Sequence, residues 1–178
     1  SATMMNKVFE IIEAKKIFDL NYKQLEILTH PKSYLHAIVK FNNGLSKLLV
    51  HDTNMIIPIF NSIYFNTDKK LKSKNIDIEA LNNLCLKKID SIRFPVVKIL
   101  NNLDKDDSLF ETIIVSANDK LVKLFLRGQI RFTDISKILL KICNIPQFNK
   151  FKSKRPKSID EISLLADYVS LKIDTMSV

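Results

Sequence analysis

The chain has 178 residues, enough for one domain, or one with a small appendage, that buries a substantial core. Its composition, 46% hydrophobic and 26% charged, is ordinary for a globular protein, and no apolar run is long enough to cross a bilayer. The net charge of +9 comes mainly from scattered lysines rather than arginines, so we interpret it as a solvated surface. A phosphate-bearing ligand is compatible with this charge but is not required by it.

The chain has only two glycines, Gly44 and Gly128. This excludes a glycine-rich phosphate loop or a dinucleotide fingerprint within it, because both need several closely spaced glycines. A nucleotide cofactor, if the function needs one, must therefore bind elsewhere. The first methionine, Met4, already lies in a helix-like segment, and we expect the chain to be the downstream part of a longer protein.

The first predicted element is a helix over residues 4–18, where apolar residues recur at helical spacing. The hydroxyls of Ser1 and Thr3 could cap its start. Asn6, Lys7 and Glu10 are separated by one, three and four positions, which places them on one side of the first two turns.

Residues 25–50 have the alternation of β-strands. Apolar residues occupy every second position over residues 25–29 and 35–41, and Asn43-Gly44 predicts a tight hairpin turn before a returning strand at residues 48–50. We predict a small, mostly antiparallel sheet of three or four strands.

The rest of the chain has helical patterns. We predict helices over residues 55–65, 96–103 and 112–127, the last ended by Gly128. Thr133 is expected to cap a helix over residues 134–143, and Ser158 to begin the final helix with a capping box. The fold class is therefore α+β, a small mostly antiparallel sheet with helices, followed by a C-terminal helical bundle. We place the domain boundary between residues 1–75 and a linker with helical domain over residues 76–178.

The start of the first helix could carry chemistry. A helix N-terminus attracts anions, and a hydroxyl from Ser1, an amide from Asn6 and the charge of Lys7 could together hold a phosphate monoester. Glu10 could bind a hard divalent cation through its oxygens. On spacing alone, an amphipathic helix with a polar face explains the same residues, and this alternative stays open.

The remaining metal-ligating residue types give a weaker signal. His30, His36 and His51 are interpreted as structural or surface histidines, because no set of three or four zinc ligands has a recognisable spacing. Cys85 and Cys143 lie among apolar residues, and we expect both to be buried thiols in a reducing cytoplasm rather than a disulfide.

Several motifs of the chain resemble those of the 1-deoxy-D-xylulose 5-phosphate reductoisomerase family. The segment SATMMNK at residues 1–7, followed by Glu10 and by Glu13-Ala14, is similar to the family's "SATMMNK…E..EA". The resemblance keeps its order along almost the whole chain: HPKS..H at residues 30–36, MIIPI at 55–59, RFP at 93–95, AND at 117–119, QIRFTDI at 129–135 and SIDE at 158–161.

The resemblance implies a function that composition does not. Members of the family convert 1-deoxy-D-xylulose 5-phosphate to 2-C-methyl-D-erythritol 4-phosphate, with NADPH and Mg²⁺ or Mn²⁺, in non-mevalonate isoprenoid biosynthesis. It implies that Ser1, Asn6 and Lys7 bind the substrate, mostly around its phosphate. It also implies that Glu10 is a catalytic metal ligand that approaches the substrate. A cytoplasmic homodimer is implied as well, with the NADPH-binding domain and two further metal-binding carboxylates upstream of Ser1.

Two regions depart from the family pattern. Lys32 stands where the family has glutamine, and residues 51–57 read HDTNMII where it has GEPDMRT. Neither change touches the four predicted site residues. The alternative function is a small basic α+β protein that binds nucleic acid through the lysine-rich residues 69–74 and 150–157, which predicts steeply salt-dependent binding.

Overall fold

A computed structural model describes residues 2–103 and 107–176 of the chain. The chain forms two compact units, one made of residues 1–27 and 90–178 and the other of residues 28–89. These units are defined by contacts in space, and the first of them contains both ends of the chain. They do not test the domain boundary that we place between residues 75 and 76, which stays a prediction. Each unit is described by itself.

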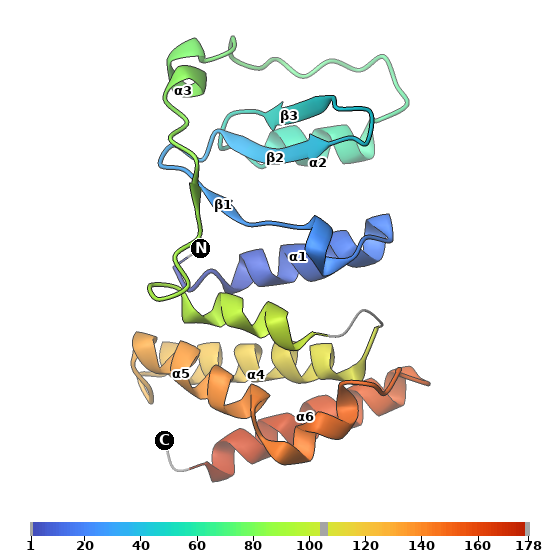
Figure 1. The fold of residues 1–178 in the computed structure, drawn as a ribbon, viewed down its shortest axis with the longest axis vertical. Coiled ribbons are helices and arrows are strands. Elements are labelled where there is room, and N and C mark those ends of the chain that lie inside the picture. Colours follow the sequence, from blue (N-terminus) through green and yellow to red (C-terminus); the bar gives the residue numbers. More distant parts are fainter. Residues whose placement is uncertain (1, 104–106, 177–178) are drawn as a thin grey trace. The chain divides into compact units, whose positions relative to one another are not determined.

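The first unit is helical (Figure 1). Its elements, in chain order, are α1 (Met5–Phe18), the 3₁₀ helix η1 (Tyr22–Gln24), the 3₁₀ helix η2 (Pro95–Asn102), α4 (Leu109–Leu126), α5 (Phe132–Cys143), the 3₁₀ helix η3 (Pro146–Phe151) and α6 (Ile159–Thr175). Four predicted helices therefore exist as α-helices close to their expected ranges, the helix predicted over residues 96–103 is the 3₁₀ helix η2, and the predicted C-terminal helical bundle is confirmed.

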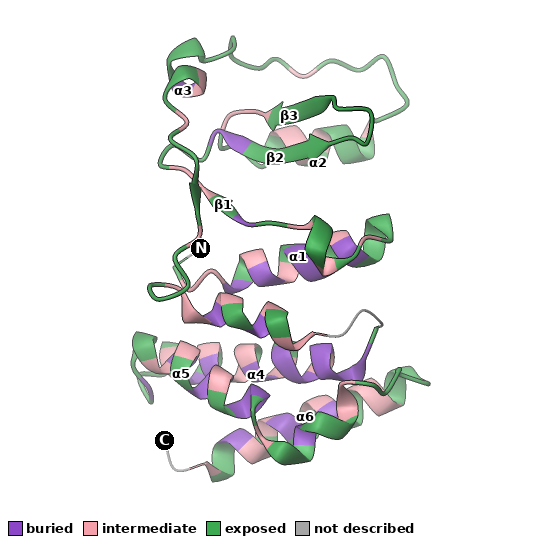
Figure 2. Cartoon of the chain, viewed as in Figure 1, coloured by how far each residue is buried: buried purple, intermediate pink, exposed green. Residues whose placement is uncertain are grey.

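Helix α4 is the centre of this unit, since it contacts α5, α6 and η3, while η2 contacts both α1 and α5. Buried residues run along the length of α4, and the other helices turn one buried stripe each toward the core (Figure 2). The fully buried side chains of largest volume include Phe110, Phe148, Met5, Ile99, Leu109, Ile113, Ile114 and Leu121. Burial of these apolar surfaces is the main stabilisation of the unit.

Residues near the ends of these helices determine where the helices begin and end. Ser158 caps α6, since its Oγ accepts a hydrogen bond from the Glu161 N–H at 3.2 Å, as predicted. Gly128, at φ 71°, follows the end of α4 and its N–H donates to the carbonyl of Phe125. The predicted cap at Thr133 is wrong. Helix α5 begins at Phe132, and the Asp134 carboxylate accepts instead from the Arg131 N–H at 3.0 Å.

The second unit contains four strands and two helices. The strands are β1 (Leu28–Thr29), β2 (Leu35–Lys40), β3 (Ser46–Val50) and β4 (Lys87–Lys88), and the helices are α2 (Ile56–Ile63) and α3 (Ile78–Asn82). All pairing is antiparallel, as predicted, but the strands form two separate sheets, β1 with β4 and β2 with β3. The single sheet that we expected is wrong because β1 pairs with a segment far along the chain that has no strand pattern.

The hairpin of β2 and β3 turns where Asn43-Gly44 predicted it. Gly44 has φ 88°, a conformation that glycine adopts at no steric cost, and its N–H donates to the carbonyl of Phe41 at 3.1 Å. A register shift follows Leu35, which pairs with Val50. The strands carry large apolar side chains that remain 41–58% exposed, namely Ile38, Val39, Leu48 and Leu49.

The two cysteines are both free thiols, as predicted, but only one is buried. Burial raises the pKa of the Cys143 thiol to about 12. Cys85 is exposed, so its predicted burial is wrong. It follows α3 with φ 45°, outside the helical geometry that its apolar neighbours suggested. Among the described residues, no helix has the length and apolarity that spanning a membrane requires.

The central position of α4 predicts a contrast between two leucines of the same helix. Leu121 is fully buried and Leu126 is 76% exposed. We expect Leu121→Ala to lower the free energy of unfolding by about 2–5 kcal/mol, because it removes buried methyl groups and leaves a cavity. The matched control Leu126→Ala should change it by less than about 0.5 kcal/mol. Urea unfolding followed by circular dichroism measures both, and equal losses would contradict the central role of α4.

Candidate functional site

The candidate site lies at the start of α1, where backbone geometry rather than a strong cap begins the helix. Met4 precedes the helix in a left-handed conformation, φ 64°, and its carbonyl accepts from the N–H groups of Lys7 and Val8. The N-cap position is occupied by Met4 and not by Thr3, so the predicted cap at Thr3 is wrong, although the Thr3 hydroxyl, just before the helix, accepts from the Met5 N–H at 3.3 Å. Ser1, the other predicted cap, lies outside the described residues.

One face of α1 is fixed by the core. Met5, Val8 and Ile12 are buried and belong to the same apolar cluster as residues of η2. Because successive helical residues are 100° apart, Asn6 and Glu10 fall on the opposite side, and both are exposed. The prediction that the polar residues share one side of the first turns is therefore confirmed.

Lys7 and Glu10 form an ion pair on this side. The Lys7 Nζ lies 2.7 Å from the Glu10 Oε2, and the two side chains are 41% and 54% exposed. The Asn6 side chain makes no hydrogen bond to any of residues 2–103 and 107–176. The site thus presents one amide, one ammonium and one carboxylate to solvent.

These groups suit an anion beside a hard cation. The first turn of α1, which is fully described, contains no acidic residue, so the positive end of the helix dipole is not neutralised there. The carboxylate of Glu10 offers oxygen, the donor that Mg²⁺ prefers, and Mg²⁺ is usually held by one or two carboxylates with water and substrate oxygens. The part of the chain that the structure describes has no group of three potential metal ligands, so Glu10 can supply one ligand but not a complete site.

The three histidines belong to the second unit. The Nε2 of His30 lies 2.8 Å from the carbonyl oxygen of Leu35. His36 and His51 stack with ring centroids 3.6 Å apart and planes 6° from parallel. The stack was not predicted: His36 lies at the register shift between Leu35 and Ala37, and His51 directly follows Val50, the partner of Leu35.

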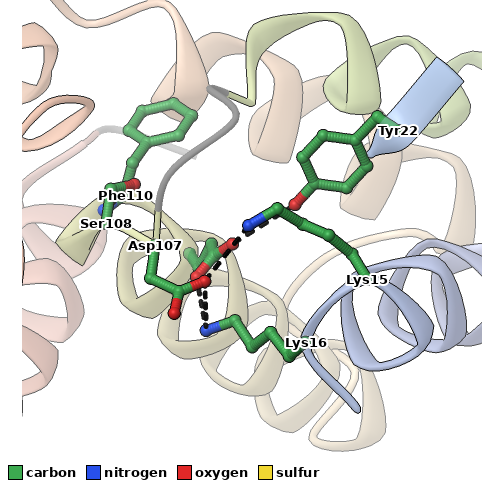
Figure 3. Close-up of polar contacts among 7 residues, drawn as sticks. Lys15, Lys16, Tyr22, Asp107, Ser108 and Phe110 are labelled. Atoms are coloured by element: carbon green, nitrogen blue, oxygen red, sulfur yellow. Dashed lines mark hydrogen bonds and ion pairs between the residues drawn. The ribbon is translucent and has the colours of Figure 1, made fainter. Parts of the chain in front are cut away.

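The other end of α1 carries a charged cluster that sequence reasoning missed (Figure 3). Lys15 Nζ lies 3.2 Å from Asp107 Oδ1, and Lys16 Nζ lies 2.6 Å from Glu111 Oε2. The Tyr22 hydroxyl donates to Glu111 Oε1 at 3.2 Å. The Lys15 and Glu111 side chains are each only 8% exposed. The cluster joins the last turn of α1 to the start of α4.

Asp107 and Tyr22 of this cluster have shifted pKa values. Partial burial would raise the pKa of Asp107, but the hydrogen bond from Lys15 and the charges of both lysines outweigh it and hold the pKa below its usual range. Burial, followed by the neighbouring Glu111 carboxylate, raises the pKa of the Tyr22 hydroxyl. Tyr22 is therefore a neutral donor at physiological pH.

Comparisons with known proteins agree on one family. A family model described as the DXP reductoisomerase C-terminal domain matches residues 51–169. The chain is 83% identical over its whole length to the 1-deoxy-D-xylulose 5-phosphate reductoisomerase of Pelagibacter ubique (strain HTCC1062), of which it covers 46%. It is 32% identical over 94% of its length to the enzyme of the same name from Sulfurihydrogenibium sp. (strain YO3AOP1), of which it covers 43%.

Solved structures show the same likeness. The reductoisomerase from Zymomonas mobilis in complex with NADPH matches the whole chain with a TM-score of 0.85 and 26% identity, over 46% of its own length. A reductoisomerase in complex with NADPH, fosmidomycin and magnesium matches 98% of the chain with a TM-score of 0.83 and 26% identity, over 43% of its own length. The chain spans less than half the length of the relatives that it matches.

The charged cluster predicts a pH-dependent effect at Asp107. A depressed carboxyl pKa stabilises the fold above the unfolded value of about 4, and this stabilisation is lost as the pH falls through the lower folded pKa. Because Asp107 is 54% exposed, we expect Asp107→Asn to lower the free energy of unfolding at pH 7 by at most about 1 kcal/mol.

The loss of unfolding free energy caused by Asp107→Asn should shrink toward zero as the pH falls from about 5 to about 2. Urea unfolding of wild type and variant at several pH values measures it. Asp167→Asn, a change at another exposed aspartate, should show no such pH-dependent difference. A stability loss at Asp107 that is constant with pH would show that the ion pairs are not its cause.

Proposed function

Because the chain belongs to the 1-deoxy-D-xylulose 5-phosphate reductoisomerase family, we propose that it supplies half of that enzyme's active site. The whole enzyme would convert 1-deoxy-D-xylulose 5-phosphate to 2-C-methyl-D-erythritol 4-phosphate with NADPH, in non-mevalonate isoprenoid biosynthesis. The observation that carries the proposal is the exposed polar side of α1, where Asn6, Lys7 and Glu10 lie together.

The phosphate group of the substrate would bind at the start of α1. Asn6 provides an amide donor without a partner among the described residues, and Lys7 provides a positive charge. The helix dipole favours an anion at the same place. Ser1 enters the proposal through its place in the sequence motif, since it lies outside the described residues. Holding the phosphate here anchors the substrate away from its reacting carbons and orients them.

Glu10 would hold the catalytic divalent cation, Mg²⁺ or Mn²⁺, one helical turn further along. A bound cation polarises the carbonyl and neighbouring hydroxyl oxygens as the carbon skeleton rearranges. Glu10 would contribute a carboxylate ligand, and the helix would hold this ligand one turn from the proposed phosphate site. The remaining ligands and the NADPH site would come from the part of the enzyme that precedes the matched region in the longer relatives.

The assembly would be a cytoplasmic homodimer. Support for dimer formation comes from the apolar side chains of β2 and β3 that remain exposed, since large exposed apolar patches mark interaction surfaces. The two free thiols fit a reducing compartment.

The nucleic-acid alternative finds no support. The relatives and structures named above are all reductoisomerases. In the basic segment of residues 150–157, Lys154 forms an ion pair with Glu161, and Lys150 lies over the ring of Phe151, 5.1 Å from its centroid. Part of this charge is thus engaged within the fold.

One prediction of the proposed function concerns the chain by itself. The 178 residues alone should show no NADPH oxidation with 1-deoxy-D-xylulose 5-phosphate, because they supply one metal ligand and no glycine-rich nucleotide loop. A chimera in which residues 1–178 replace the matching 46% of the Pelagibacter ubique relative should be active. Absorbance at 340 nm measures NADPH oxidation by the isolated chain and by the chimera. Turnover by the isolated chain would contradict the proposal that it supplies only half of the active site.

Another prediction distinguishes the role of Glu10 from that of a neighbouring glutamate. In the same chimera, Glu10→Gln should lower kcat/KM by about 100-fold or more, because metal polarisation is worth several kcal/mol. Glu13→Gln, a matched change one turn further along α1, should leave kcat/KM near wild type. Thermal unfolding of both variants checks that the fold is retained. Wild-type activity in Glu10→Gln would contradict its role as a metal ligand.

A further inference from the structure

The two charged residues of the site are bound to each other. Lys7 Nζ and Glu10 Oε2 are 2.7 Å apart across one turn of α1. A carboxylate that holds an ammonium group presents less free negative charge to a cation. Likewise, an ammonium group held by a carboxylate is less available to a phosphate. The ion pair therefore engages both charges of the site with each other.

We propose, on the basis of the function proposed above, that Lys7 exchanges partners between Glu10 and the substrate phosphate. When a divalent cation takes the Glu10 oxygen, Lys7 leaves it and moves to the phosphate, and a phosphate that draws Lys7 away frees Glu10 for the cation. Each ligand then prepares the site for the other, so that the two bind with positive coupling through one lysine.

The charges around Lys7 favour this exchange. A cation on Glu10 would lie close to the ammonium group and repel it. The first turn of α1, described in full, has no other carboxylate to receive the released lysine. The helix N-terminus attracts an anion, and the Asn6 side chain there has no partner among the described residues. The four-carbon stem of lysine is flexible enough to change partners without moving the helix.

The exposure of the pair sets the size of the effect. Ion pairs this exposed, 41% and 54%, contribute only about 0–1 kcal/mol, which corresponds to at most about fivefold in affinity. Coupling is reciprocal, so the cation should tighten phosphate binding by the same factor by which phosphate tightens cation binding. We expect the contribution of Lys7 to the coupling to be about two- to fivefold.

The test uses the full-length chimera with the Pelagibacter ubique relative, without NADPH. The probe is Mn²⁺, whose free concentration is measured by electron paramagnetic resonance, with and without saturating inorganic phosphate. Association of Mn²⁺ with phosphate is measured in protein-free buffer and subtracted. The coupling factor is the ratio of the Mn²⁺ dissociation constants without and with phosphate.

The wild-type coupling factor should exceed that of Lys7→Gln by about two- to fivefold. Without phosphate, Lys7→Gln should bind Mn²⁺ more tightly than wild type, because Glu10 is already free. Lys7→Arg should restore coupling, and Lys23→Gln, the same loss of charge at an exposed residue of η1, should leave it unchanged.

Equal coupling factors in wild type and Lys7→Gln would overturn the exchange and leave direct attraction between cation and phosphate as the cause. A wild-type protein without coupling would overturn it too. If wild type and Glu10→Gln bind Mn²⁺ equally, the metal role of Glu10 itself fails, and the exchange fails with it. The two failures are distinguished by whether the Glu10 variant loses Mn²⁺.

Discussion

The apolar contact between α1 and η2 is the constraint on which the site depends. Val8 of α1 is fully buried in one cluster with Val96 and Ile99 of η2. Since helical residues are 100° apart, a side that buries Val8 must turn Asn6 and Glu10 outward. A rotation of α1 by one residue would bury a charge without a partner, at a high energetic cost. Hydrophobic packing on one side of the helix therefore fixes the direction in which the polar groups on the other side face.

The charged cluster holds the opposite end of the same helix. Lys15 and Lys16 lie in the last turn of α1, where the helix dipole is negative, and Glu111 lies in the first turn of α4, where it is positive. The lysine charges and the Glu111 charge are thus each stabilised by the dipole of their own helix. The ion pair between the helices stabilises them further. Lys15 is five residues from Glu10, or about 7.5 Å along the axis. With apolar contacts at one end and ion pairs at the other, α1 is a rigid carrier for its polar side.

Local patterns in the sequence predicted local structure, but they did not predict pairings between residues that are far apart in the sequence. The hairpin followed from Asn43-Gly44 and the start of α6 from Ser158, since each depends on a few adjacent residues. The bond of Lys15 to Asp107 joins residues 92 positions apart, and β1 pairs with the distant β4, Leu28 with Lys88, so neither leaves a periodic signal. Spacing predicted the shared side of the site residues and suggested a phosphate and a cation, but it left a merely polar helix face as an alternative, and the preference between the two came from a resemblance.

The exposure of the site is consistent with its being half of a larger one. A single carboxylate in water competes poorly with the hydration shell of Mg²⁺, so firm binding needs further ligands and the exclusion of water. The same exposure keeps the pair of Lys7 and Glu10 weak, whereas a buried pair would cost several kcal/mol to break. A weak pair can be replaced by ligands at little cost. The solvent-facing start of α1 therefore combines a firm backbone, fixed by the core, with side chains that are free to change partners.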